Sequence, residues 1–221
     1  MTKKIQSVIE YLTLVGFNRP ETTIYRGQKD CSWGVIPRIA TKYDKNGDEI
    51  SGNKEKLIFR NFIRRTGPFT DYKNMSQIEW LILAQHHELP TRLLDWSGFP
   101  MVALYFSVEM DNGGNDSCVY IHVPQKVVTQ ESIVDPYRID GNKCIHAMYT
   151  HIRMAYQKSY FILFKDPFKD MKSECETVII SGEFRKSIKR ELNIMGINRM
   201  TLFPDMDNIA KYTTWSFTND H

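Results

Sequence analysis

Apolar residues recur every three or four positions along several segments of the chain, which is the spacing of one face of an α-helix. Ile5, Val8 and Leu12 show this spacing first, and Gly16 follows as a stop signal. Ser76 and Glu79 have the capping-box spacing that marks the start of another helix. The pattern predicts helices over residues 3–15, 54–66, 76–87, 100–108 and 184–195.

Short runs of β-branched and aromatic residues lie between these helices and predict strands. The clearest run is Cys-Val-Tyr-Ile-His-Val at residues 118–123. The first run is followed by Arg26 and Gly27, which places an arginine at the carboxyl end of its strand. We expect strands over residues 22–25, 92–96, 118–123, 159–164 and 177–180.

The order of these elements predicts the fold class. The chain has 221 residues, of which 42% are hydrophobic, and this is enough for one domain around a sizeable core. No repeat or low-complexity segment interrupts the pattern. We therefore expect an α+β fold, a single domain with a mixed β-sheet flanked by helices.

Charge and composition exclude few functions. Twenty-nine basic and 26 acidic residues give a net charge of +3, which is too balanced to indicate a nucleic-acid-binding protein by itself. No apolar run approaches the roughly 18 residues of a membrane helix, and the first residues lack the apolar stretch of a secretory signal. We expect a cytoplasmic protein with no membrane partner.

The densest group of chemically versatile residues lies between positions 85 and 96. It contains His86, His87, Arg92 and Asp95 around a predicted turn between a helix and a strand. Sites are often built at such turns, so these residues are candidates to line one pocket together with Arg26. Arg92 and Asp95 are three positions apart, which predicts different partners for them. The alternative is that they pin the loop by hydrogen bonds.

A metal site is not expected. His86 and His87 are adjacent, whereas zinc-binding helices space their ligands four residues apart. The four cysteines match neither a zinc spacing nor a compact disulfide framework, so we interpret them as reduced thiols. One histidine is instead expected to handle a proton or a hydrogen bond, and the other to cap the helix.

The segment Tyr25-Arg26-Gly27-Gln28 is a second candidate. An arginine grips phosphate through two parallel hydrogen bonds, and a neighbouring glycine lets a ligand approach the backbone. The alternative is an ordinary loop arginine.

Several motifs resemble the FRG domain family. They lie at residues 25–28 (YRGQ), 33–38 (WGVIPR), 84–96 (AQHHELPTRLLDW), 100–106 (PMVALYF) and 201–207 (TLFPDMD). Tyr25 stands where the family name has phenylalanine. The resemblance implies an FRG domain over residues 20–212, preceded by an N-terminal helix over 1–19 and followed by a C-terminal tail over 213–221. The family occurs in bacteria and their phages.

The layout of this family is similar to that of ADP-ribosyltransferases of the Arg-Ser-Glu type, which implies a fold of that type and NAD as a substrate. In this comparison Arg26 corresponds to the arginine that holds NAD. Ser97 falls where the serine-containing strand ends. Gln157 stands where a transferase carries glutamate.

The resemblance also implies roles for individual residues. Chemistry would involve His87, Asp95 and Gln157, and the acid or base would be Asp95, Glu174 or Glu176. NAD would be held by Tyr25, Arg26, Gly27, His86, Arg92, Ser97 and Tyr105, with Tyr25 or Tyr105 stacking on nicotinamide.

Two functions remain open from the sequence. The first is an NAD-dependent ADP-ribosyltransferase or NAD-cleaving enzyme that acts in toxicity or phage–host conflict. The second is a non-catalytic module that binds a nucleotide or a nucleic acid, which the glutamine at position 157 favours. The predicted basic helix would then bind nucleic-acid phosphates with Lys54, Lys56, Arg60 and Arg64.

Overall fold

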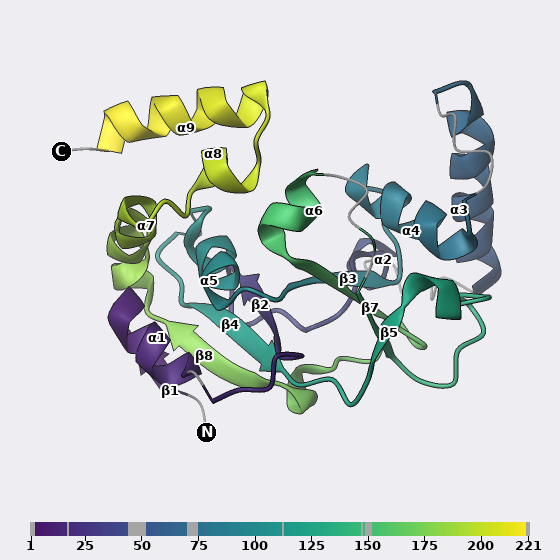
Figure 1. Cartoon of the computed structure of the whole chain (residues 1–221), viewed down its shortest axis with the longest axis horizontal. Helices are drawn as coiled ribbons and strands as arrows, with labels where there is room; N and C mark the ends of the chain where they lie inside the picture. Colours follow the sequence, from purple (N-terminus) through teal and green to yellow (C-terminus); the bar gives the residue numbers. More distant parts are fainter. Residues whose placement is uncertain are drawn as a thin grey trace.

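The computed structural model describes residues 3–16, 18–43, 52–69, 75–111, 113–146, 148 and 152–219 (Figure 1). Their strands form one sheet of eight, in the spatial order β1-β8-β4-β2-β3-β7-β6-β5. The strands are β1 (Lys3–Ile5), β2 (Ile24–Gln28), β3 (Leu93–Ser97), β4 (Ser117–His122), β5 (Val127–Thr129), β6 (Lys143–His146), β7 (Ser159–Leu163) and β8 (Glu176–Ile180). The edge strands β1 and β5 pair in parallel with their neighbours and the inner pairs are antiparallel, so the sheet is mixed.

Helices flank this sheet, which confirms the α+β prediction. They are α1 (Val8–Val15), α2 (Arg38–Tyr43), α3 (Gly52–Thr66), α4 (Gln77–His86), α5 (Pro100–Val108), α6 (Ile152–Gln157), α7 (Arg185–Ile194), α8 (Arg199–Leu202) and α9 (Met206–Asn219). Single 3₁₀ turns occur at Gly67–Phe69, Gln130–Ser132, Lys172–Glu174 and Gly182–Phe184. Among the described residues no helix is both long and apolar enough to cross a membrane.

The sheet consists of two halves that are joined at a narrow point. Within the described part of the chain, β2 and β3 share a single register pair, Tyr25 with Ser97, whereas β2 pairs with β4 along its whole length. One half therefore contains β1, β8, β4 and β2, and the other contains β3, β7, β6 and β5. In Figure 1 these halves lie side by side, with α1, α5 and α7 over the left half and α3, α4 and α6 over the right half.

Each half has its own core. Val8, Tyr11 and Leu104 belong to the core under α1, α5 and α7, and Ile78, Leu81 and Leu163 belong to the core under α3, α4 and α6. A third cluster, which contains Ile24, Leu94 and Tyr120, covers the opposite face and extends across both halves. The two separately packed halves leave room for a cleft where β2 and β3 separate.

Most predicted elements are confirmed to within about two residues, but two predictions at the N-terminal end are wrong. Residues 3–5 are not helical; they form the edge strand β1, and the helix begins at Val8 after Ser7, whose hydroxyl accepts a hydrogen bond from the Glu10 amide. Three residues are too few to show a period, so the sequence could not separate strand from helix there.

The other wrong prediction concerns the end of the first strand. It does not stop before Arg26; β2 continues to Gln28, opposite Cys118. Gly27 does not break the strand because it serves packing: a Cβ there would lie 1.9 Å from the main-chain oxygen of Ala103 in α5. At the other end of the chain, most of residues 213–221, predicted as a tail, belong to α9.

Candidate functional site

Arg26 bridges the point at which the two halves of the sheet separate. Continuing the Tyr25–Ser97 register by two residues would place Gly27 opposite Asp95, but the strands have already diverged there. The Arg26 side chain crosses the gap instead, and its Nη1 donates to the main-chain oxygen of Asp95 at 2.7 Å. A cation therefore lies in the opening between two central strands.

Two cavities meet at this arginine. Both are lined by Arg26, Gln28, Trp33 and Asp95. The α4 lobe, of about 410 Å³, is completed by Gly34, Ile36, Arg38, Thr41, Gln85, Leu89, Leu93 and Leu94. The α5 lobe, of about 470 Å³, is completed by Tyr25, Gly27, Lys29, Trp96, Ser97, Phe106, Glu109, Met110, Gln157, Ser159 and Phe203. Each lobe lies within the size range of about 300–1,000 Å³ that is typical of ligand pockets.

Three buried polar atoms at the cleft have no hydrogen-bond partner among the described residues. They are Arg26 Nε, Gln28 Oε1 and Trp96 Nε1. Such atoms are rare in folded proteins because each costs free energy when it is left unpaired. Two donors and one acceptor therefore lie without partners on residues that line the cleft.

Two charged side chains of the cleft, Arg26 and Asp95, have neighbours that influence their charge and orientation. Burial lowers the pKa of the Arg26 guanidinium from its ordinary value, and the nearby Asp95 carboxylate opposes this shift. The ordinary pKa of arginine is so high that Arg26 remains protonated. The Asp95 side chain is exposed, and its Oδ2 accepts a hydrogen bond of 2.9 Å from Gln85 Nε2. Gln85 is oriented in turn by the Thr91 hydroxyl, which donates to its oxygen.

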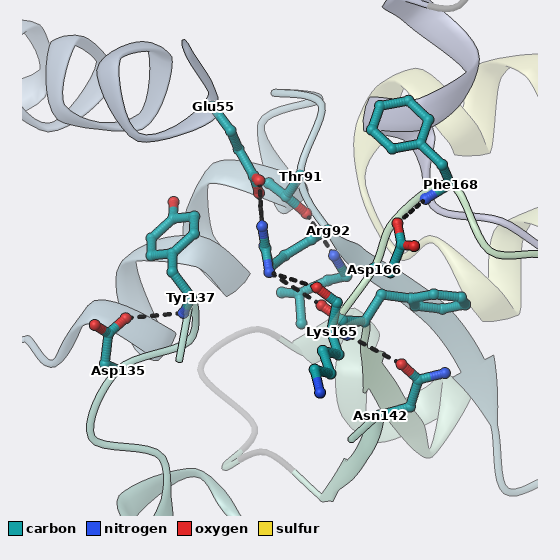
Figure 2. Close-up of polar contacts among 11 residues, drawn as sticks. Glu55, Thr91, Arg92, Asp135, Tyr137, Asn142, Lys165, Asp166 and Phe168 are labelled. Atoms are coloured by element: carbon teal, nitrogen blue, oxygen red, sulfur yellow. Dashed lines mark hydrogen bonds and ion pairs between the residues drawn. The ribbon is translucent and has the colours of Figure 1, made fainter. Parts of the chain in front are cut away.

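Arg92 does not line the cleft, contrary to the prediction that it shares a pocket with Arg26. Figure 2 shows its side chain pointing toward Glu55 of α3, and Arg92 Nε donates to Glu55 Oε1 at 2.8 Å. Its Nη1 donates to the main-chain oxygens of Phe164 and Lys165. The centroid of the Tyr137 ring lies 4.7 Å from its guanidinium carbon. The side chains of Arg92 and Glu55 are only 7% and 6% exposed, so this pair holds α3 against the sheet.

The two histidines also lie outside the lobes. His86 ends α4 and His87 caps it, with their rings edge to face at a centroid distance of 5.3 Å. Tyr105 is buried and donates to Glu109 Oε1 at 3.3 Å, and it lines a smaller cavity beneath α9 instead. Of the two tyrosines predicted to stack on a ligand, the structure places only Tyr25 in a lobe.

Ser97 and Gln157 are brought together in the α5 lobe. The Ser97 hydroxyl donates to the main-chain oxygen of Gln157 at 2.6 Å and accepts from the Phe99 amide at 2.9 Å. The Gln157 side chain donates to the main-chain oxygen of Leu202 at 3.1 Å. These bonds connect the end of β3 with α6 and α8, so both residues shape the wall of the lobe.

The two remaining carboxylates of the sequence prediction lie elsewhere. Glu176 pairs with Arg19 at 2.8 Å, and Glu174 lines a separate cavity to which β4, β6 and β7 contribute residues. Within the described residues no three His, Cys, Asp or Glu side chains gather as a metal site would require.

Several lining residues were not among the site residues predicted from the sequence, including Trp33, Glu109 and Phe203, and Gln28 was named only as part of the motif at residues 25–28. Gln28 follows Arg26 by two positions, so the alternation of a longer strand would have placed both on one face. Glu109 and Phe203 reach the lobe through the packing of α5 and α8, which no local pattern reveals.

The sequence model of the FRG domain family matches residues 21–116, and the chain contains an FRG domain. This range includes β2, β3 and α5, and with them Arg26, Gln28 and Asp95. No curated protein and no solved structure matches the chain.

Proposed function

We propose that this FRG-domain protein binds NAD in the two lobes and breaks its bond to nicotinamide, passing ADP-ribose to an acceptor or to water. The observation that carries the proposal is the position of Arg26, a cation with an unpaired buried donor at the junction of two lobes of similar size. NAD has the corresponding shape, since two nucleosides are joined by an anionic pyrophosphate. Arg26 grips the pyrophosphate and each lobe takes one nucleoside.

The α5 lobe suits the nicotinamide half. Phe106 and Phe203 pack edge to face there with their ring centroids 5.9 Å apart, and Tyr25 adds a third aromatic side chain. When the glycosidic bond breaks, its electron pair moves to the nicotinamide nitrogen and neutralises that ring. An aromatic and largely apolar pocket favours the neutral product over the charged ring.

Asp95 is the carboxylate that faces the reacting sugar in this proposal. Bond breaking leaves positive charge on the ribose, and a carboxylate at the junction of the lobes stabilises that charge. Asp95 then takes the proton that the attacking hydroxyl or water loses. Gln85 holds the carboxylate in one orientation through its 2.9 Å hydrogen bond.

Calorimetric titration of the full chain with NAD tests whether the cleft binds this ligand. We expect saturable binding with a stoichiometry of one, weakened by Arg26→Lys. Absence of heat and of thermal stabilisation at millimolar NAD would overturn the proposal. Destruction of NAD fits the role in toxicity or phage–host conflict that the family resemblance implies.

A second function, binding to nucleic acid, is favoured by one observation on α3. The only acidic residue of this helix, Glu55, is turned inward and paired with Arg92. The other charged side chains of α3 are all basic, namely Lys54, Lys56, Arg60, Arg64 and Arg65. Such a group of basic side chains attracts phosphates without reading a sequence.

A further inference from the structure

Gln28 occupies an unusual position at the junction of the lobes. It is 7% exposed and lies two residues after Arg26 in β2, so the two side chains share one face of the strand. Its Nε2 donates to the main-chain oxygen of Gly34 at 3.0 Å, while its Oε1 is buried and has no partner within the described chain. The amide is thus half satisfied, and the free half is an acceptor.

The orientation of this amide is fixed by the loop that follows β2. Turning the amide over would bring Oε1 against the Gly34 carbonyl, and two acceptors repel each other. The loop itself is anchored by Asp170, whose Oδ1 accepts from the amides of Val35 at 2.9 Å and Lys172 at 2.8 Å. Asp170 also packs closely against Gly34, since a Cβ at this position would lie 2.6 Å from Asp170 Oδ2. The Oε1 end of the amide is therefore fixed in position before a ligand binds, in a residue that lines both lobes.

A preset buried acceptor selects the group that it meets. A ligand N–H or O–H satisfies Gln28 Oε1, whereas a carboxylate or phosphate at the same place would put two acceptors together in a dry site. Arg26, about 7 Å away along the strand, has the opposite preference, since its donors require an anion. Together the two residues favour a ligand that places an anionic group at Arg26 and a neutral hydrogen-bond donor at Gln28.

We infer that Gln28 is a specificity-determining residue that admits dinucleotides with a neutral hydrogen-bond donor beside the pyrophosphate and rejects those with an anion there. This inference rests on the proposed binding of NAD. NAD also carries donors at its other ribose hydroxyls and at the adenine amino group, but the two donors that have anionic counterparts are the nicotinamide carboxamide and the 2′-hydroxyl of the adenosine. Nicotinic acid adenine dinucleotide replaces the first with a carboxylate, and NADP replaces the second with a phosphate.

Titration calorimetry of the full chain with these three dinucleotides tests the inference. Wild-type protein is expected to bind NAD at least about tenfold more tightly than one of the two analogues, and the analogue that binds more weakly identifies the donor. Gln28→Met keeps the volume of the side chain and removes its acceptor. We expect this variant to bind NAD about tenfold more weakly and to bind all three dinucleotides within about threefold of one another.

The exposed glutamine at the start of α4 supplies a matched control, Gln77→Met, which should leave all three affinities unchanged. Equal binding of the three dinucleotides by wild-type protein overturns the inference without any variant, and so does a Gln28→Met protein that keeps the wild-type preference. In both cases NAD binding itself survives. Failure of wild-type protein to bind NAD overturns the proposed function together with this inference.

Discussion

Arg26 Nη1 lies 2.7 Å from the main-chain oxygen of Asp95, so one side chain takes the place of the ladder hydrogen bonds that β2 and β3 do not form. This hydrogen bond connects the two halves of the sheet across the cleft. It also occupies only one nitrogen of the guanidinium, and Nε is buried without a partner among the described residues.

Arg26→Lys is expected to weaken NAD binding about tenfold or more with little loss of stability. Lysine keeps the charge but cannot bond the Asp95 oxygen and a phosphate at once through a planar fork. Titration calorimetry and thermal unfolding measure the two effects. Arg138→Lys, at an arginine whose side chain is 83% exposed, is the control. Unchanged affinity in Arg26→Lys would remove Arg26 from the binding site.

Asp95→Asn is expected to separate chemistry from folding. Asparagine retains an oxygen that accepts from Gln85, so the melting temperature should stay within about 2 °C, while loss of the negative charge lowers nicotinamide release at least about tenfold. Asp207→Asn, on the exposed first turn of α9, is the control. Full activity accompanied by a lower melting temperature would show that Asp95 is only structural.

Arg92→Met is expected to lower the free energy of unfolding by about 3–5 kcal/mol, because it leaves the Glu55 carboxylate buried without its partner. Urea titration measures this decrease. The double variant Arg92→Met/Glu55→Leu removes both charges and should recover most of the stability. Where the single variant remains folded, its NAD affinity should match that of the wild type. A weaker affinity for NAD at unchanged stability would show that Arg92 belongs to the binding site.

The attachment of α9 is expected to depend on pH. Hydrogen bonds from Asn208, followed by the interaction with Arg153, lower the pKa of Asp205 to about 2. A carboxyl whose pKa is lowered by folding stabilises the protein above its ordinary pKa of about 3.9 and loses that effect as the pH falls toward 2. Fluorescence of Trp215 in α9 should therefore change between about pH 4 and pH 2. In Asp205→Asn this acid transition should disappear; its persistence would assign it to another group.

Nucleic-acid binding, the second function, predicts a dependence on salt. Replacing Lys54, Lys56, Arg60 and Arg64 with glutamine should reduce the slope of log affinity against log salt by about one for each phosphate that the helix no longer binds. Filter binding or fluorescence anisotropy with single- and double-stranded oligonucleotides measures this slope. A wild-type protein that shows no binding at about 50 mM salt would exclude this function.

Local patterns predict the elements well and the partners of single residues poorly. The capping box at Ser76 and Glu79 forms as its spacing predicts, because all of its groups lie within one helical turn. Arg92 illustrates the opposite case, since its partner Glu55 is 37 positions away and nothing near Arg92 indicates that it turns inward. Which of two neighbouring polar residues faces the cleft is decided by such distant interactions.

The first strand shows a second reason why the site could be predicted only in part from the sequence. Glycine weakens strands, so the sequence predicts a strand end at Gly27, yet packing against α5 requires glycine at that place. With the strand extended from Tyr25 to Gln28, Arg26 and Gln28 fall on one face of it, where both line the two lobes. The α5 lobe could not be predicted because Glu109 and Phe203 enter it from helices placed by tertiary packing.

Release of nicotinamide from NAD by the intact protein is the most direct measurement of the central claim. Chromatography of NAD incubated with wild-type protein, Arg26→Lys and Asp95→Asn separates enzyme from binding module. We predict time-dependent release by the wild type and release that is slower by about tenfold or more in both variants. Absence of release by the wild type, together with NAD-dependent thermal stabilisation, would contradict cleavage and leave a binding module. Absence of both release and stabilisation would contradict NAD as the ligand of this cleft.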